Sequence, residues 1–467
     1  MERTVVAVRS GAASRPATLL VLVAGLISAA ACVALGWGQF QRGEAHTYDL
    51  GIFSQSAASW ASGQLPTSDI LGGKRLLGDH FSPLTVVFGL VWTLWPDPRG
   101  LVIAQGVLLG LGTALVSRAA VRNLPLPAAA GVAVSVLVAH GSLAAARFDV
   151  HEVALAVPFL ALSATALLER RHLAAAGWSL PLLVVKEDLG ATVMVVAVLV
   201  FCSGRRRLGV LLALAAVAGL ALALGTMAAV SPAHDLSRLS VFSAAGAAGP
   251  TVWERSELLL VVVVGGGVVW VRSPLALLTV PTLMWRLASH ERSYVSSVLH
   301  YDAVLVPVIG VALVDVLRRL ATVDSRDRPR LGAGIAWAGA GCSAVVTAIL
   351  LPPATVFTSV TAWEPGPRLT ALREAAVTIP QGARVAADSS SGAYLLGRSG
   401  GDHDVFGWSA DQPVDTLPQW VVIATDRASV GTTLPQSRAW LARVRTVPGV
   451  VVTEVGTTAV VHFTGEH

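Results

Sequence analysis

The chain has 467 residues, of which 54% are hydrophobic and 13% charged, and its formal net charge is +5. This composition excludes an ordinary soluble globular protein. Apolar runs of about 16–22 residues recur between Ala17 and Leu351, and each is long enough to cross a bilayer core. The three cysteines all lie in apolar runs, which excludes a disulfide framework and a cysteine-based zinc site. We therefore predict an all-α polytopic membrane protein.

The positive charge follows the predicted side of the membrane. With residues 1–16 placed as a cytoplasmic amino terminus, the loops predicted to lie inside carry 16 basic and five acidic residues. The outer loops and the carboxy-terminal tail carry more acidic than basic residues. This asymmetry is the positive-inside pattern. Arginine-rich, lysine-poor usage is typical of a bacterium with GC-rich DNA, so we predict a multi-pass protein of the bacterial cytoplasmic membrane, with no nucleic-acid partner.

The first apolar run, 17–37, follows a basic leader without a small-residue cleavage site, so we expect a retained helix and not a signal peptide. A long outer loop, 38–98, follows it and contains a candidate interfacial helix, Leu50–Ser62. The segment Phe81–Trp95 is apolar but short and carries Pro83. If it crossed the membrane, the later arginine clusters would lie outside. We therefore expect it to lie in the outer interface or to re-enter.

The membrane domain, 17–352, contains about eleven predicted spans. Two short spans meet at Lys186-Glu187-Asp188, which implies a tight outer hairpin or helix ends that dip into the membrane. A run of three glycines, Gly265–Gly267, lies within one span and indicates close helix packing. The predicted spans are 17–37, 99–117, 126–146, 152–168, 173–186, 188–204, 208–230, 256–271, 273–290, 301–318 and 331–352.

Residues 353–467 have the composition of a small soluble α/β domain. Runs rich in β-branched residues predict strands at 385–388, 420–425, 450–455 and 459–463. Helices are predicted at 368–378 and 437–445. With about eleven spans before it, this domain is expected to be extracytoplasmic.

Four polar clusters occur at the outer ends of predicted spans: His46–Asp49, Gly78–Pro83, Arg147–Glu152 and Lys186–Asp188. All lie at one predicted depth, so the helix ends can surround one polar cavity. Ionisable groups at such a depth are costly and normally mark function. Carboxylates there can act as a general base or hold a divalent cation, whereas Lys, Arg and His can bind a phosphate.

The two lysines are separate candidates. Among 34 basic residues only Lys74 and Lys186 are lysines, and Lys74 lies in the loop that carries Asp79 and His80. A chain that uses arginine almost everywhere else indicates that these two positions need an ammonium group.

Each cluster also has a purely structural interpretation. Asp49 can cap the interfacial helix, and Asp149 with Glu152 three residues later resembles a capping box. Asp79-His80 can be a satisfied loop pair. The three charges of Lys186–Asp188 can neutralise one another as a local ion network.

Further polar residues lie outside the four clusters. His300 and Tyr301 open a predicted span and are candidates for binding a substrate. Asp315 is expected to pair with Arg318 or Arg319, one helical turn away. His140, inside a span, is expected to be a hydrogen-bonded core residue. P-loop, dinucleotide-binding, HExxH and nucleophile-elbow motifs are absent from the sequence, so nothing indicates a soluble nucleotide cofactor.

The motifs YDLGIF (48–53), GDHFSP (78–83), RFDVHE (147–152) and VKED (185–188) resemble those of a bacterial membrane-protein family of unknown function. That family is grouped with the GT-C superfamily of glycosyltransferases. The resemblance rests on the order and spacing of all four motifs and covers about residues 17–320.

This resemblance implies a polyprenyl-phosphate sugar donor and an essential acid in the first extracytoplasmic loop. By position, Asp49 takes the place of that acid, and Glu152 or Asp149 that of a second-loop acid. The interfacial helices of GT-C loops agree with a non-spanning Phe81–Trp95. Some GT-C enzymes need a divalent metal and others do not. The implied cofactor is therefore either none or Mg or Mn, held by Asp49, Asp149 and Glu152.

We predict an inverting glycosyltransferase that moves a sugar from a polyprenyl phosphate to a cell-envelope glycan, lipid or protein. Asp49 would be the general base, and Lys186 with Lys74 or Arg75 would hold the phosphate. Asp149, Glu152 and Glu187 would orient the acceptor or bind a metal, and the tail domain would recognise the acceptor or a partner protein. The remaining expected substrate-binding residues are Tyr48, Asp79, His80, His151, Asp188, His300 and Tyr301.

Two other functions remain open at this point. A transporter or flippase of lipid-linked or small polar solutes could use the same charges for translocation or proton coupling. It would need charges in both halves of the bundle, and here they concentrate at the outer ends. A catalytically silent scaffold that presents the outer domain is the third interpretation.

Overall fold

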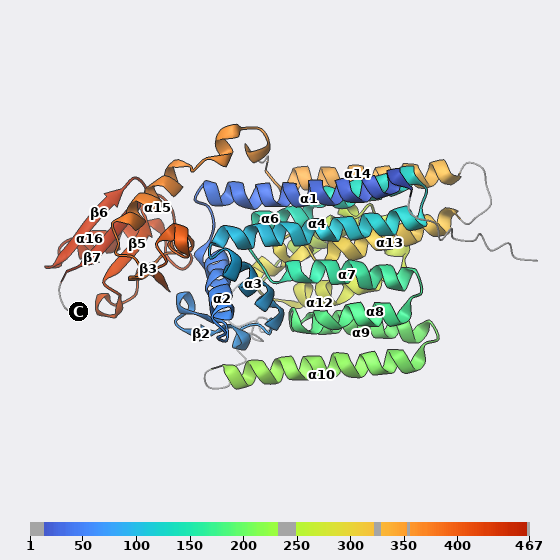
Figure 1. The fold of residues 1–467 in the computed structure, drawn as a ribbon, viewed down its shortest axis with the longest axis horizontal. Helices are drawn as coiled ribbons and strands as arrows, with labels where there is room; N and C mark the ends of the chain where they lie inside the picture. Colours follow the sequence, from blue (N-terminus) through green and yellow to red (C-terminus); the bar gives the residue numbers. More distant parts are fainter. Residues whose placement is uncertain (1–13, 232–248, 322–327, 353–354, 465–467) are drawn as a thin grey trace, which may run out of the picture.

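The computed structural model describes residues 14–231, 249–321, 328–352 and 355–464. Roughly parallel helices form the larger part, and an α/β domain lies against one end of this bundle (Figure 1). Most of the predicted cytoplasmic segment 1–16, and the loop residues 322–327 with Arg326, lie outside the described residues.

Each of the eleven predicted spans contains a helix. Within the described residues, five helical stretches are long and apolar enough to cross a membrane by length and composition: α1 (Arg15–Gln41), α4 (Pro98–Asn123), the joined α5 (Leu126–Leu137) and α6 (His140–Arg147), α10 (Arg206–Val230) and α14 (Arg328–Leu350). The other predicted spans hold shorter helices: α7 (Val153–Leu168), α8 (His172–Ser179), α9 (Leu189–Cys202), α11 (Val252–Gly265), α12 (Val280–Ala288) and α13 (Leu305–Ala321).

The glycine run ends a helix instead of continuing it. The predicted span 256–271 stops at Gly265, and Gly267 adopts φ +80°, a conformation that favours glycine. A Cβ on Gly267 would lie 2.7 Å from the Cα of Gly339 in α14. The expected close packing is therefore present, but the prediction of a continuous helix through residue 271 was wrong.

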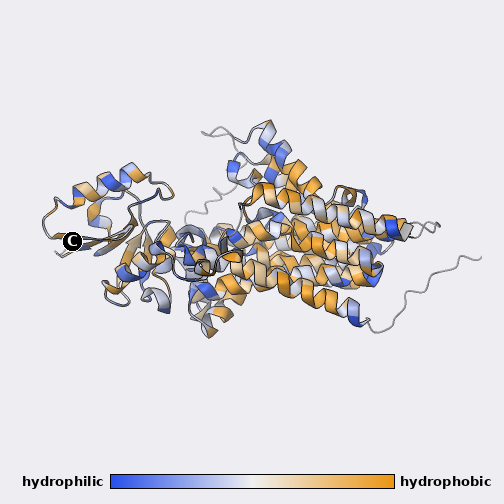
Figure 2. Cartoon of the chain, turned by 90° about the horizontal axis from the view of Figure 1, so that it is seen from above, coloured by the Kyte–Doolittle hydropathy of each residue, from blue (hydrophilic) through white to orange (hydrophobic). Residues whose placement is uncertain are grey.

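The sides of the bundle are apolar, as a lipid-facing surface requires. Figure 2 shows hydrophobic residues along the helices and hydrophilic residues gathered towards the bundle ends and the α/β domain. Only 22% of the most apolar window of α10 is buried by the rest of the protein, against 61% for α4. The α10 helix therefore stands at the edge of the bundle, as Figure 1 shows.

The first outer loop folds across the end of the bundle. A π-helical turn, η1 (Thr47–Gly51), leads into α2 (Ile52–Ala61), so the predicted helix Leu50–Ser62 begins two residues later than expected. The Phe81–Trp95 segment forms only the nine-residue helix α3 (Val86–Leu94). This helix packs on α2 through the rings of Phe53 and Phe88, 6.3 Å apart. So short a helix agrees with a non-spanning segment.

The carboxy-terminal domain is built on a five-stranded sheet of order β4-β3-β5-β7-β6. Strands β3 (Arg384–Ala387), β4 (Asp404–Gly407) and β5 (Trp420–Ala424) are parallel, and β6 (Val450–Val455) and β7 (Thr458–Phe463) add antiparallel pairs. The helices α15 (Pro367–Val377) and α16 (Leu434–Val444) lie close to their predicted ranges. Strand β4 was not predicted.

The domain docks on the segment that connects α1 to η1. The Tyr394 hydroxyl accepts a hydrogen bond from the Ala45 N–H (2.7 Å), and the Thr47 N–H donates to the Ser389 carbonyl (2.7 Å). The buried Arg368 donates to the carbonyls of Gly43 (2.8 Å) and Ser390 (3.2 Å). The docked segment, residues 43–47, ends two residues before Asp49.

Candidate active site

A cavity of about 570 Å³ lies at the end of the bundle nearest the α/β domain, and all four polar clusters reach it. They contribute Tyr48 and Asp49, Asp79 and His80, His151 and Glu152, and Lys186 with Glu187 and Asp188. His300 and Tyr301 complete the polar wall. The structure thus brings together residues that lie more than 250 positions apart in the sequence.

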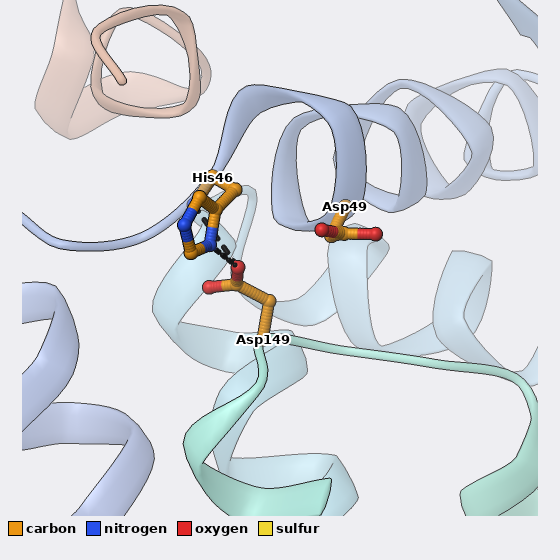
Figure 3. A group of neighbouring side chains, drawn as sticks. All are labelled: His46, Asp49 and Asp149. Carbon is orange, nitrogen blue, oxygen red and sulfur yellow. Dashed lines mark hydrogen bonds and ion pairs between the residues drawn. The ribbon is translucent and has the colours of Figure 1, made fainter. Parts of the chain in front are cut away.

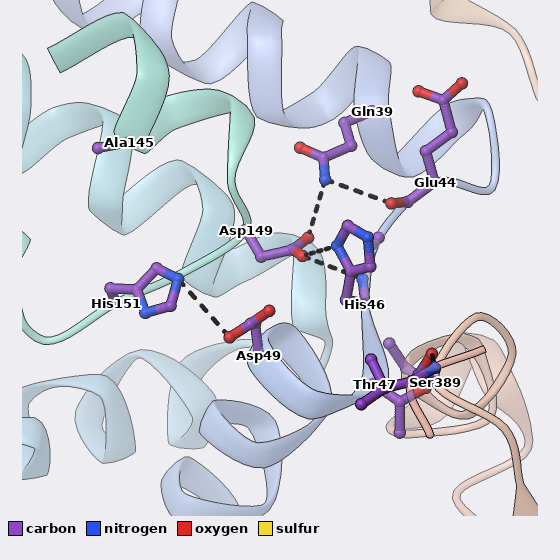
Figure 4. A network of polar contacts seen from close by, with 12 residues as sticks. Gln39, Glu44, His46, Thr47, Asp49, Ala145, Asp149, His151 and Ser389 are labelled. Carbon is purple, nitrogen blue, oxygen red and sulfur yellow. Dashed lines mark hydrogen bonds and ion pairs between the residues drawn. The ribbon is translucent and has the colours of Figure 1, made fainter. Parts of the chain in front are cut away.

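Asp49 is the carboxylate best placed for chemistry in this cavity. It lies in the η1 turn, and its side chain is 25% exposed. Burial, reinforced by the nearby charges of Asp149 and Glu152, raises the pKa of Asp49 to about 7. The imidazole Nε2 of His151 lies 3.8 Å from its Oδ1 (Figure 4). No side-chain cap bond is made at the start of α2, so the helix-cap interpretation of Asp49 was wrong.

Asp149 lies behind Asp49 and outside the cavity lining. Its Oδ2 accepts from the backbone N–H of His46 (3.0 Å) and contacts the His46 ring Nδ1 (2.6 Å), while Gln39 donates to Oδ1 (3.2 Å). Burial raises the pKa of Asp149, and the hydrogen bond to Asp149 raises that of His46. The cap of α7 is Glu152, without a side-chain cap bond, so the predicted Asp149–Glu152 capping box was wrong.

Lys186 and Glu152 form an ion pair in the cavity wall. The ammonium Nζ lies 2.7 Å from Glu152 Oε1, and both side chains are nearly buried. Each charge compensates the other in surroundings that would otherwise favour the neutral forms, so the pair keeps an ammonium group and a carboxylate in the cavity wall.

Glu187 does not neutralise Lys186 by direct contact; it binds the GDHFSP motif. Its Oε1 lies 2.7 Å from His80 Nδ1, and its Oε2 accepts from the Phe81 N–H at 3.0 Å. Asp188 keeps an enclosed Oδ1 without a hydrogen-bond partner among the described residues. The local ion network expected for residues 186–188 is instead spread over three chain segments.

The second lysine does not itself line the cavity. Lys74 pairs with Asp79 at 2.6 Å and His80 with Glu187 at 2.7 Å, so the interpretation of Asp79-His80 as a satisfied pair within the loop was wrong for His80, whose partner lies in another segment. Arg75 is exposed on the short strand β2 (Lys74–Arg75) and does not line the cavity.

Aromatic rings form the rest of the cavity wall, and some of these residues were not predicted from the sequence. The imidazoles of His151 and His300 stack with centroids 3.5 Å apart, and burial lowers the pKa of His151 to about 4. The ring of Tyr301 packs edge-on against those of Trp285 and Tyr294. An apolar side comes from α10 through Leu220, Leu224 and Met227. Trp285 and the α10 residues carry no signal in one sequence, because they look like ordinary span residues.

A buried ion cluster supports this wall from inside the bundle. Asp302 pairs with the fully buried Arg286 and with His140 Nε2 at 2.9 Å. Asp302 directly follows His300 and Tyr301, so the cluster fixes the turn that carries both rings. The prediction that His140 is a hydrogen-bonded core residue is confirmed, as is the pairing of Asp315 with Arg318 (3.4 Å) and Arg319 (2.6 Å).

Within the part of the chain that the structure describes, one group of side chains could hold a metal ion. His46, Asp49 and Asp149 each offer a ligand atom, and these atoms lie within 4.8 Å of one another (Figure 3). Glu152, expected as a ligand with Asp49 and Asp149, is not in this group and contacts Lys186. His46 was not predicted to bind a metal ion, because it lies two residues before the YDLGIF motif.

Comparison with solved structures shows the fold. The chain is similar to ArnT from Cupriavidus metallidurans in the crystal structure bound to undecaprenyl phosphate: the TM-score is 0.59 at 14% identity over 95% of this chain and 99% of that one. For the apo structure of the same protein the TM-score is 0.51 at 15% identity, over 95% and 98% of the chains. These matches establish a GT-C-like fold.

Sequence comparison places the chain in a family. No protein among the curated sequences matches it. A family described as "Predicted membrane protein (DUF2079)" matches residues 44–444, a range that includes all four polar motifs. The chain therefore belongs to the DUF2079 family of predicted membrane proteins.

Proposed function

We propose that the protein is a membrane glycosyltransferase that moves a sugar from a polyprenyl-phosphate donor to an acceptor on the side of the α/β domain. The observation that carries the proposal is a half-buried carboxylate and a charged lysine facing one partly apolar cavity. The fold is shared with a protein whose structure contains undecaprenyl phosphate, which supports a donor of this class.

Asp49 would act as the general base. The acceptor hydroxyl oxygen attacks the anomeric carbon of the donor sugar while its proton passes to an Asp49 oxygen. The bond between the anomeric carbon and the phosphate oxygen breaks, and the polyprenyl phosphate leaves, so the anomeric configuration inverts. A carboxylate with a pKa of about 7 suits this step, because it is a stronger base than an ordinary aspartate and about half of it is still ionised at neutral pH.

Lys186 would bind the phosphate of the donor and stabilise it as it leaves. Its ammonium has three N–H groups, and the contact with Glu152 occupies one side of it. Because Lys74 and Arg75 do not line the cavity, we assign this role to Lys186 alone. His80, placed in the cavity by Glu187, is a second candidate donor of hydrogen bonds.

The other polar residues would orient the substrates. Glu152 forms an ion pair with Lys186, and Glu187 contacts His80. Asp149 contacts His46, which directly precedes the η1 turn. The stacked rings of His151 and His300, with Tyr48 and Tyr301, would bind the sugar through polar edges and ring faces. Asp188 also lines the cavity, and its enclosed Oδ1 accepts no hydrogen bond from the described residues. The α/β domain would bind a glycan, lipid or protein acceptor from the cell envelope.

A divalent metal, if the enzyme uses one, would bind at His46, Asp49 and Asp149. Two carboxylates and one imidazole suit Mn²⁺ or Zn²⁺ better than Mg²⁺, which prefers oxygen ligands.

Native mass spectrometry of the detergent-purified protein tests the proposal. The wild type should retain a polyprenyl phosphate or its glycoside, Lys186→Ala should lose it, and Asp49→Asn should keep it while losing transfer. Arg75→Ala is the control, because Arg75 is exposed and does not line the cavity, and it should behave like the wild type. Turnover by Asp49→Asn would remove Asp49 as the base. Absence of bound lipid phosphate from every variant, also with added donor, would instead favour a transporter.

A further inference from the structure

A basic cavity lies at the opposite end of the bundle, where the proposed reaction does not use it. It measures about 1020 Å³ and lies between the turn that joins α7 to α8 and the turn that joins α9 to α10. Both turns are at the end of the bundle away from the α/β domain (Figure 1). The basic residues that line it are Arg170, Arg171, His172, Arg205, Arg206 and Arg207.

Most of these charges have no counter-ion among the described residues. Glu169 pairs with Arg171 at 2.7 Å. Among the residues that the structure describes, no ion pair engages Arg170 or any of the three arginines 205–207. Guanidinium groups that share a cavity repel one another, so the cavity stabilises a bound anion.

The backbone adds to this preference. Both α8 and α10 begin at the cavity, with Arg171 and Arg205 at their N-cap positions and no side-chain cap bond at either. Helix N-caps are normally Ser, Thr, Asp or Asn, which satisfy the first N–H groups. Uncapped N-termini leave these N–H groups and the positive end of the helix dipole available to an anion.

Arg170 occupies a position where glycine is usual. At the end of α7 its φ is +57°, in the left-handed region, and the Arg171 N–H bonds back to the Ala166 carbonyl at 2.8 Å. The chain thus keeps a cationic side chain at the cavity where a glycine would relieve backbone strain.

The rim of the cavity is apolar on the side of the bundle surface. Leu173, Ala174 and Leu208 line it, and Leu173 is 77% exposed. Leu211, one turn further along α10, is 64% exposed. A lipid has an anionic headgroup next to hydrocarbon chains. It therefore matches a cavity with a basic lining and an apolar rim better than a free ion does.

We propose that this cavity binds the phosphate headgroup of an anionic membrane lipid, with its acyl chains along Leu173 and the adjoining face of α10. Arginine forks bind phosphate oxygens in pairs, which suits a phosphodiester. The positive-inside rule accounts for the sign of charge at this end of the bundle. It does not account for arginines at two uncapped helix starts around one cavity.

Native mass spectrometry of delipidated protein, titrated with phosphatidylglycerol or phosphatidylcholine, tests this site. The triple variant Arg205→Gln, Arg206→Gln, Arg207→Gln is compared with Arg15→Gln, Arg118→Gln, Arg330→Gln. The control removes the same charge from exposed arginines that do not line the cavity. We expect wild type and control to prefer phosphatidylglycerol and the first triple to lose on the order of 100-fold in affinity for it.

Equal losses in the two triples would overturn the site in favour of diffuse attraction. Displacement of the lipid by excess inorganic phosphate would identify a free phosphate as the ligand and also overturn the lipid assignment. If the first triple does not fold, Arg170→Gln replaces it, because glutamine retains most of the side-chain volume. Unchanged phosphatidylglycerol binding by a folded Arg170→Gln would count against the site.

Discussion

The carboxyl group of Asp49 shares its surroundings with two other acids. Burial and the charges of Asp149 and Glu152 act in the same direction and raise the pKa to about 7. A general base must be deprotonated, so the rate should rise as pH rises through 7. Below that point kcat/KM should fall about tenfold per pH unit. A pH–rate profile checks this, and a profile that is flat from pH 5 upward would contradict the assignment.

The Lys186–Glu152 pair is nearly buried, so each charge depends on the other. Glu152→Gln or Lys186→Met alone should lower the free energy of unfolding by about 3–5 kcal/mol, because an unpaired charge remains. The double variant completes a double-mutant cycle and should lose less stability than the two single variants together. Thermal unfolding in detergent measures the coupling.

A surface pair provides the control for this cycle. Arg42 and Glu44 lie 2.7 Å apart with both side chains partly exposed, and Glu44→Gln should cost about 0–1 kcal/mol. Additive losses in the buried cycle, as small as those of the surface pair, would mean that Lys186 and Glu152 are solvated independently.

At the residue level the sequence identified the participants but not their partners. The four motifs could be recognised because ionisable groups interrupt apolar runs. The pairs Lys186–Glu152, His80–Glu187 and His46–Asp149 join residues 34 to 107 positions apart. Only the Asp315 pairing was predictable, because helical geometry fixes neighbours three and four residues away.

At the level of elements, the α/β domain holds residues 43–47 through backbone groups. Arg368→Ala removes hydrogen bonds to two carbonyls and an ion pair to Asp426 at 2.6 Å. The Ala45 and Thr47 amides should then exchange with deuterium about tenfold faster or more. Hydrogen–deuterium exchange of peptides covering 43–49 measures this. Arg445→Ala, which breaks an exposed pair with Glu454, should leave the rate unchanged.

The elements themselves were predictable to different degrees. Apolar runs located every helix in the predicted spans, since hydrocarbon length leaves little freedom. Strand β4 escaped because Asp404–Gly407 is short and follows a glycine-rich turn. The η1 turn also escaped, because a π-helical turn before α2 arises from tertiary contacts, such as the one between Thr47 and Ser389.

For the whole molecule, the charge distribution predicts one orientation: the basic end in the cytoplasm and the α/β domain outside. Cys202, exposed near the basic cavity, is a natural probe, since Cys32 is buried and Cys342 lies within the α14 span. A membrane-impermeant maleimide should label it only after intact cells are opened. Asp415→Cys in a Cys202→Ser background should be labelled in intact cells. The reverse pattern would invert the topology.

The docking of the carboxy-terminal domain on residues 43–47 ties together two parts of the gene that are far apart. In the sequence, almost the whole membrane bundle lies between the docked segment, residues 43–47, and the α/β domain. In the structure the two meet beside Asp49. Recombination only at the boundary near residue 352 would combine a new α/β domain with a docked segment, residues 43–47, from a different protein. Within this family, the two pieces are expected to be inherited, and should be exchanged in chimeras, as a single unit.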